Sequence, residues 1–335
     1  MGFNRVIGYM GVAIQSAKGT AASAAKFKFP IYSGGIPVTK ELADEEISTA
    51  SRNQGDPYVS GVIVPVEFET RAFVGSFVML MQAALGARTT TGASDPYSHA
   101  IATGAVPYLT FWCSMGASDA VSTMAQDVKL DTLELTWTGP SACRLAVKGF
   151  GTTADMTAAD FDATAIDETD GDGYFFPVGG TFQWDAVGAT AADFVCEAGG
   201  LAISNNLERV NHCGMVTAYD HDEGKLGAAF SLTTVPANAD AWIETLTGAA
   251  NGSAPDGDVY FGKVNIVLQE AGTGTHTTTI VASRVPWEIP PLTIDASNGK
   301  YTSEVSGSAR YNSTESDALD VTITNANAAA VYVAA

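Results

Sequence analysis

Apolar and polar residues alternate along most of this 335-residue chain, with the two-residue period of a strand that faces a core on one side. The alternation is clearest from Val62 to Thr70, from Val128 to Trp137 and from Lys263 to Gln269. Turns rich in glycine and polar residues separate these runs, and Tyr108 to Met115 adds an aromatic one. The pattern predicts a mainly β protein.

One segment, FVGSFVMLMQAALG, has the 3.6-residue period of a helix instead. Thr70 is the expected N-cap and Gly86 the expected C′ residue, so the helix should cover residues 71–85. Apolar side chains occupy most of its circumference, so nearly all of it should be covered, with Met79 and Met81 filling the core rather than contacting a cofactor. The apolar stripe consists of Phe73, Val74, Phe77, Val78, Leu80, Met81, Ala84 and Leu85.

The same landmarks recur later in the chain at nearly constant spacing. GGIPVTKEL and GGLAISNNL begin 165 residues apart, at Gly34 and Gly199. The starts of the strands that follow are 166 residues apart, and the glycines that end the helices, Gly86 and Gly248, are 162 apart. Three landmarks in one order indicate an internal duplication.

The second helix is expected from Asn238 to Leu246. Asn238 or Asp240 should cap it, and Trp242, Ile243 and Leu246 should form its buried stripe. Each half is therefore expected to be a β-sandwich or barrel with one helix packed across it. The predicted divisions are an N-terminal arm (1–30), a first module (31–151), an acidic linker (152–173), a second module (174–324) and a C-terminal tail (325–335).

Composition narrows the possible functions. Apolar residues make up 46% of the chain, enough for a sizeable core, and the net charge of −20 argues against binding nucleic acid through its phosphates. We expect no signal peptide, membrane span or myristoylation. The four cysteines have no metal-site spacing and are expected to be buried, reduced thiols: Cys113, Cys143, Cys196 and Cys213.

Three short stretches invite a chemical interpretation. GDVYFGKV (257–264) has phosphate-loop spacing, but no Ser or Thr follows Lys263 and a strand is expected where that motif needs a helix. DETDGDGYF (167–175) is calcium-like in composition only, since its acidic residues miss the required positions. In YDHDEGK, His221 lies between two aspartates without a nucleophile, and we interpret it as part of a surface turn before a strand.

The other histidines, His99, His212 and His276, are scattered without the spacing of a zinc site. We therefore predict no catalytic, cofactor-binding or metal-binding residue, no cofactor and no enzymatic activity.

The order of segments resembles that of phage major tail proteins, also called tail tube proteins. The segments are a Gly- and Ala-containing arm (VAIQSAKGTAASAAKFKFP), GGIPVTKEL, a long polar loop, a strand, a helix ending in QAALGA, and meandering strands. The resemblance covers Val12 to Thr324. It implies a structural virion protein that self-assembles into stacked rings, forming a tail tube through which DNA passes without specific binding.

The resemblance also implies partners and a location. The loop Thr39–Gly61 and the arm through Phe29 should contact a neighbouring subunit or ring, because such a long polar loop has no core of its own. Tape measure, tail terminator and tail tip proteins are implied partners, and the virion tail, assembled in the host cytoplasm, is the implied location. A trimeric ring with six modules is favoured over a hexamer. The alternative is another virion decoration or receptor-binding protein, or a secreted β-sandwich binding protein.

Overall fold

A computed structural model gives the fold and describes most of the chain. The described residues are 8–43, 57–115, 122–156, 165–168, 173–188, 192–235, 240–250, 252–255, 257–272, 274–290, 302–314 and 317–334.

The first half of the chain, residues 8–156, contains eleven strands and the longer helix, α1 (Val74–Leu85). The strands are β1 (Gly8–Ile14), β2 (Phe27–Ile31), β3 (Ser33–Gly35), β4 (Thr39–Ala43), β5 (Tyr58–Arg71), β6 (Gly86–Thr91), β7 (Tyr97–Thr103), β8 (Leu109–Met115), β9 (Ser122–Thr138), β10 (Arg144–Gly151) and β11 (Thr153–Asp155). A short strand, β12 (Ile166–Asp167), precedes the second half.

The second half, from residue 173, contains helix α2 (Asp240–Thr247) and a short 3-10 helix, η1 (Ala329–Tyr332). Its strands are β13 (Phe175–Asp185), β14 (Ala192–Asp193), β15 (Cys196–Ser204), β16 (Glu208–Val210), β17 (Asp220–Asp222), β18 (Gly227–Thr234), β19 (Gly262–Glu270), β20 (Thr277–Val285), β21 (Trp287–Glu288), β22 (Ser303–Ser308) and β23 (Asp320–Asn325). The prediction of a mainly β fold is confirmed.

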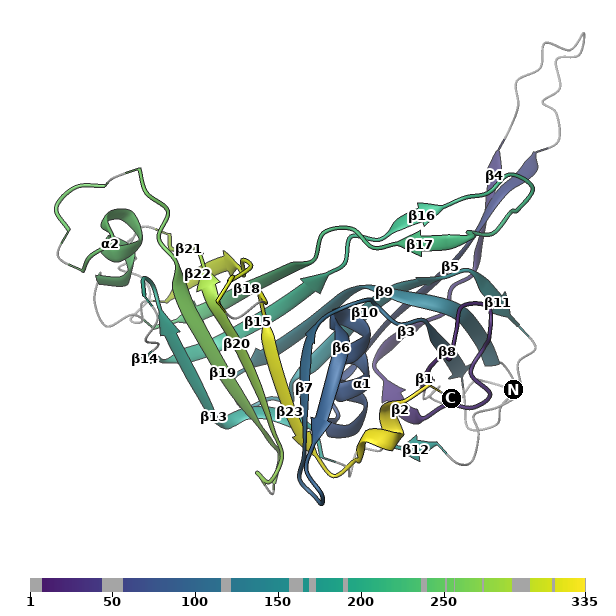
Figure 1. The fold of residues 1–335 in the computed structure, drawn as a ribbon, viewed down its shortest axis with the longest axis horizontal. Coiled ribbons are helices and arrows are strands. Elements are labelled where there is room, and N and C mark those ends of the chain that lie inside the picture. The colour runs from purple at the N-terminus through teal and green to yellow at the C-terminus, as the bar shows by residue number, and fades with distance from the viewer. Residues whose placement is uncertain are drawn as a thin grey trace, which may run out of the picture.

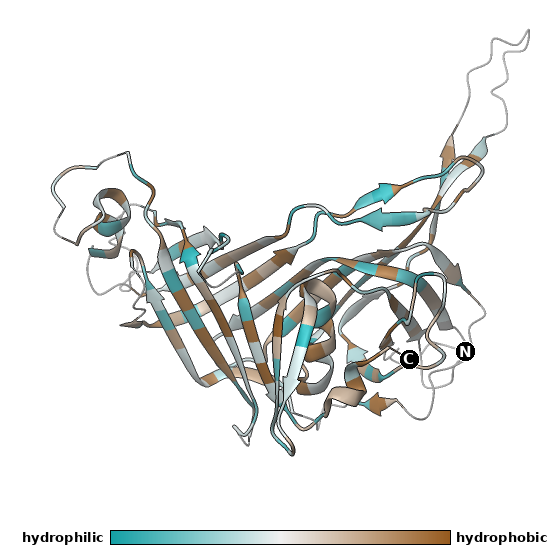
Figure 2. Cartoon of the chain, viewed as in Figure 1, coloured by the Kyte–Doolittle hydropathy of each residue, from teal (hydrophilic) through white to brown (hydrophobic). Residues whose placement is uncertain are grey.

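The described strands form a large sheet of fourteen strands, a second sheet of seven, and the separate hairpin β16–β17. The large sheet contains an eight-stranded run, β3-β5-β10-β9-β15-β18-β22-β21, which we call the long sheet. The seven-stranded sheet, in the order β14-β13-β19-β20-β23-β7-β6, lies across from it, and α1 lies between the two (Figure 1). Hydrophobic and hydrophilic residues alternate along several of these strands (Figure 2), and the apolar ones supply most of the buried core.

The two halves pair their strands in the same order. In the first half, β2, β1, β8, β9 and β11 are successive neighbours, and β3, β5, β10 and β9 form a second series. In the second half, the corresponding series are β14, β13, β19, β20 and β23, and β15, β18, β22 and β21. The repeated glycine pairs fall at matching places: Gly34 pairs with Phe68, and Gly199 pairs with Leu232.

The halves are joined through both sheets. In the long sheet, β9 of the first half pairs with β15 of the second, and in the other sheet β7 pairs with β23. Gly199 is required at the first junction, because a Cβ there would lie 2.6 Å from the ring of Trp137 on the paired strand. Neither large sheet closes into a barrel in the described parts of the chain, so the expected barrels are not present. The long sheet continues from one half into the other instead.

Helix α1 is buried on nearly every side, as its apolar circumference predicts, and Met79 and Met81 lie in the core. It begins at Val74, so the prediction of Thr70 as N-cap was wrong. Thr70 belongs to β5, and its hydroxyl donates to the carbonyl of Pro30 over 2.7 Å. Glu168 caps the first turn of α1 instead: its Oε1 accepts hydrogen bonds from the N–H groups of Gly75 and Ser76. Gly86 ends the helix with φ of 107°, as predicted.

Helix α2 differs from α1 in its packing. It starts at Asp240, and the expected cap Asn238 lies outside the described residues. None of its residues is buried; Trp242 and Ile243 are half-buried and Leu246 is exposed. The predicted buried stripe was therefore wrong, because α2 lies at one end of the molecule, beside the ends of the sheets and not between them (Figure 1).

Three predicted segments have a different structure. The expected arm supplies β1 and β2, whose Met10, Val12 and Phe27 are fully buried in the core. Within the expected linker, residues 153–155 and 166–167 pair with the large sheet. The C-terminal tail docks on α1 through Tyr332, whose hydroxyl donates to the carbonyl of Gly75 over 3.0 Å. The arm and linker segments are held by pairing with other strands of the large sheet, and the tail is held through Tyr332.

Candidate assembly surfaces

The long sheet has one face on the core and one face without a covering layer of described strands. Along β5, Val66 and Phe68 face the core while Glu67 and Glu69 are exposed. Small or polar residues occupy most of the outer face in the second half: Gly200, Ala202, Ser204, Ala229, Ser231, Thr233, Ser306 and Ser308. In sequence, this face is therefore recognised by strands in which apolar residues alternate with small or polar ones.

Acidic side chains outnumber basic ones on this outer face. The cations Arg71, Arg144 and Lys148 all lie on β5 and β10, in the first half. The carboxylates extend along the whole long sheet and comprise Glu67, Glu69, Glu134, Glu288 and Glu304. The named charges balance in the first half, and the excess of carboxylates lies in the second half, at Glu288 and Glu304.

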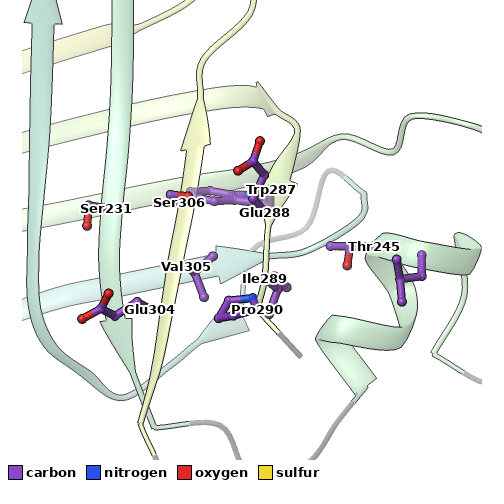
Figure 3. Close-up of a pocket in the computed structure, with 10 residues that line it drawn as sticks. Ser231, Thr245, Trp287, Glu288, Ile289, Pro290, Glu304, Val305 and Ser306 are labelled. Carbon is purple, nitrogen blue, oxygen red and sulfur yellow. The ribbon is translucent and has the colours of Figure 1, made fainter. Parts of the chain in front are cut away.

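The long sheet ends in two strand edges that have no described neighbour. At one end lie β21 and β22, beside a surface hollow of about 590 Å³. Figure 3 shows Glu288, Ile289 and Pro290 along this hollow, with Thr245 of α2 across from them. At the other end lies β3, where a second hollow is lined by Ser33 and residues of β5, β9 and β10. The two ends lie on opposite sides of the molecule (Figure 1).

Two hairpins form a projection at the upper right of the molecule in Figure 1. We call this projection the arm; it is distinct from the N-terminal arm that was expected over residues 1–30. It consists of the hairpin of β4 with the first half of β5 and of the hairpin β16–β17, one from each half of the chain. Val62 donates its N–H to the carbonyl of Val216 over 2.7 Å, which joins the hairpins. The predicted polar loop Thr39–Gly61 is therefore strand at both ends, and its residues 44–56 lie outside the described residues.

The arm exposes apolar side chains at its outer end. Leu42 is 63% exposed and Tyr58 is 51% exposed. The exposed set on both hairpins comprises Leu42, Tyr58, Val59, Met215, Val216 and Tyr219. An apolar projection of this kind is typical of a surface that a partner covers.

The most enzyme-like sequence cluster holds the base of the arm together. Asp220 accepts hydrogen bonds from Lys18 Nζ and the Tyr108 hydroxyl, both at 2.8 Å. Burial alone would raise the pKa of Asp220, but these two donors hold it below its usual value. Lys129 adds an ion pair to Glu223 with 3.2 Å between Nζ and Oε1. The cluster joins Asp220 and Glu223 to Lys18, Tyr108 and Lys129 of the first half, and none of these five side chains is a Ser or Cys.

His221 lies in strand β17 and is buried, so its interpretation as part of a surface turn was wrong. Its ring stacks on Phe150 at 5.8 Å between centroids, and burial lowers its pKa. His99 is also buried and bonds to Asn325, while His276 contacts Glu270 and Asp95. The described histidines therefore have separate structural partners.

The two remaining motifs carry no described site. Lys263 of the phosphate-loop-like stretch lies in β19, so a strand follows it as the sequence predicted. Residues 169–172 of the calcium-like stretch lie outside the described residues. Among the residues that the structure describes, no group of three or more His, Cys, Asp or Glu side chains could hold a metal ion.

The cysteines are all free thiols, but they are not all buried. Cys113 and Cys143 lie in the core, and burial raises the pKa of Cys143 to about 12. Cys196 is half-buried and Cys213 is exposed in the hairpin of the arm, contrary to the prediction for those two.

No protein-family model and no curated protein matches this sequence. No helix in the described part of the chain is long and apolar enough to cross a membrane.

Proposed function

We propose that this chain is a structural virion protein that assembles into stacked rings and forms a phage tail tube, the conduit for genome ejection. The observation that carries the proposal is the long sheet, which runs through both halves and ends in two free edges. A ring subunit needs such edges because its sheet must continue into both neighbours. The proposal assigns the chain no enzymatic role and a place in the virion tail.

We also propose that the two halves are copies of one tube module. The repeated glycine pairs and the equal order of strand pairing support this, because the glycine pairs fall at matching places in the two corresponding strand series. Thr70 and Thr234, which follow Phe68 and Leu232 by two residues, are both buried and both donate to backbone carbonyls. Two modules per chain would allow three chains to build a six-module ring.

The outer face of the long sheet is the proposed wall of the lumen. The cations named on this face, Arg71, Arg144 and Lys148, are confined to the first half, so the second half would offer DNA no cationic contact and DNA would slide past without being held. The arm is the proposed contact to the ring above or below, because its exposed apolar side chains need a cover. Tape measure, terminator and tip proteins would contact the ends of such a tube.

Electron microscopy of the purified full-length chain tests the proposal. We expect rings or tubes with an axial channel in negative stain. A matched variant, Leu42→Asp with Tyr58→Asp, should form single rings that no longer stack. It places charges on the exposed apolar surface of the arm and leaves the edges of the long sheet unchanged. Particles that stay monomeric at every concentration would contradict the tube. Monomers that bind the outside of another virion component, or a glycan, would favour the decoration or binding-protein alternative.

A further inference from the structure

We propose that β21 of one copy pairs antiparallel with the β3–β4 edge of a second copy, in the register that β9 and β15 use inside the chain. The inference rests on the ring assembly proposed above and adds to it the two edges, their order and their residue-by-residue pairing. The partner is a second copy of this chain. The internal junction between the halves supplies the template.

The internal junction has a defined hydrogen-bonding phase. Strands β9 and β15 pair from Thr132 opposite Ser204 onward. Asn205 donates its N–H to the carbonyl of Asp131 over 2.7 Å, one residue beyond that pair. Because hydrogen-bonded and non-hydrogen-bonded pairs alternate in an antiparallel ladder, Thr132 and Ser204 form a non-hydrogen-bonded pair.

The β3–β4 edge is the first-half counterpart of β15. Ser204 lies five residues after Gly199 and pairs with Gly227 of β18. Thr39 lies five residues after Gly34 and pairs with Ile63 of β5. On its other side Ser204 has Thr132, whereas Thr39 is exposed and its strand has no second partner among the described residues.

Strand β21 is the second-half counterpart of this part of β9. Thr132 pairs with Lys148 of β10, which pairs with Glu67, the residue before Phe68.

The same path exists in the second half. Glu288 pairs with Ser306 of β22, which pairs with Ser231, the residue before Leu232. Glu288 therefore takes the place of Thr132, and its free side should receive Thr39 of the second copy. The pair Glu288–Thr39 is then also non-hydrogen-bonded.

Two prolines fit this register. Pro290 and Pro37 would lie opposite each other, in the place that Glu134 and Ala202 occupy at the internal junction. That place is again a non-hydrogen-bonded pair, two residues from Thr132. A proline lacks only its N–H, so neither ring removes a hydrogen bond from the new ladder.

The apolar face continues across the same junction. Ile289 would lie opposite Val38, in the places of the buried Leu133 and Ile203. Ile289 and Val38 are only half-buried in the single chain, so pairing would cover both. The N–H of Val38 donates to the carbonyl of Ile36 over 3.0 Å, and this local turn must open when the second copy arrives.

The register also gives the strands a tilt that suits a closed sheet. A row of paired residues that starts at Gly35 crosses β5, β10 and β9 and reaches Ser204, the counterpart of Thr39. The row thus advances four residues (39 minus 35) for every four strands. With about 3.3 Å per residue and about 4.8 Å between strands, the strands tilt by roughly 35°, within the range of closed barrels. Repeating the internal junction between copies therefore gives the sheet the strand tilt of a closed barrel.

Disulfide trapping tests the register. In a Cys213→Ser background of the full-length chain, Glu288→Cys and Thr39→Cys are combined, because a non-hydrogen-bonded pair brings Cα atoms to about 4.5 Å, within reach of a disulfide. Mild oxidation should give covalent oligomers that end at one closed species. Mixing the two single variants should give covalent dimers only. The matched control combines Glu288→Cys with Lys40→Cys, whose side chain points to the other face, and should cross-link at least tenfold less.

The outcomes separate this inference from the proposed function. Rings or tubes in the microscope without a Glu288–Thr39 cross-link would overturn the register and leave the tube. Equal or stronger cross-linking through Lys40 would also overturn the register. A chain that forms neither rings nor cross-links at any concentration would overturn both proposals.

Discussion

Arg209 and Glu41 form an ion pair between the two hairpins of the arm, with 2.9 Å between Nη1 and Oε2. Glu41 lies in β4 of the first half and Arg209 in β16 of the second, 168 residues apart. Arg209 also donates through Nη2 to the carbonyl of Val62 over 3.3 Å. One side chain therefore ties the second hairpin to the first along the projection.

Replacing this side chain should loosen the arm without unfolding the molecule. Both partners are partly exposed, at 26% and 46%, so Arg209→Ala should lower the free energy of unfolding by no more than about 1 kcal/mol. Hydrogen exchange of residues 208–222 should nevertheless become faster, while exchange in β9 stays unchanged. Glu41→Gln is the matched variant. An exchange rate in the hairpin that neither variant alters would show that the pair has no structural role.

The two helices should respond differently to truncation. Phe77 of α1 is fully buried, so Phe77→Ala should lower the free energy of unfolding by about 3–5 kcal/mol. Trp242 of α2, which the sequence placed in a buried stripe, is only half-buried, so Trp242→Ala should lower the free energy of unfolding by less than half as much. Chemical denaturation of both variants measures the difference. Equal losses would mean that α2 is part of the core.

This contrast indicates what the sequence could predict. Alternation identified β5, β9 and β19, and an apolar circumference identified α1, because these signals are local. The start of α1 could not be predicted, since the group that satisfies its first turn is Glu168, more than ninety residues away. The burial of α2 could not be predicted either, because a helical stripe does not specify the surface that covers it.

The candidate assembly surfaces also include features that the sequence could predict and features that it could not. The duplicated glycine pairs and the strands that follow them were visible in sequence, and they fall on the long sheet. The free edges were not visible, because an edge depends on which strands lack a neighbour. Likewise β1 and β2 looked like an arm, because β1 becomes a core strand only when β8 pairs with it, and β2 in turn pairs with β1.

Acidification should destabilise the fold through its buried histidines. Burial lowers the pKa of His99 and of His221 below the value of about 6.5 expected in the unfolded chain. The unfolded state then binds more protons than the folded state below that pH, so stability is lost as the pH falls through about 6.5. The melting temperature of the wild type should fall between pH 7 and pH 5. The melting temperature of His221→Leu should fall less over the same range. If it falls as much as that of the wild type, His221 does not contribute to the pH dependence.

Thiol labelling should distinguish the four cysteines. Cys213 is exposed, so it should react with a thiol reagent in the native protein within minutes, followed slowly by the half-buried Cys196. Cys113 and Cys143 should react only after denaturation, since burial raises the pKa of both thiols. Cys213→Ser should abolish the fast phase. Fewer than four reactive thiols in denatured, unreduced protein would contradict the expectation that all are reduced.

The last prediction is the symmetry of the ring. Each chain contributes eight strands to the long sheet, so three copies give a wall of twenty-four strands. At a strand spacing of about 4.8 Å and a tilt of roughly 35°, such a wall has a diameter of about 45 Å, and six copies would double it. The narrower wall is the one that can guide a single DNA duplex. The halves also differ in a way that suits alternating neighbours, because α1 is enclosed and α2 is not.

We therefore expect the covalent ladder of the Glu288→Cys, Thr39→Cys variant to end at three chains. Averaged cryo-electron microscopy images should show threefold symmetry with six similar lobes, whereas six chains related by true sixfold symmetry would exclude the trimeric ring.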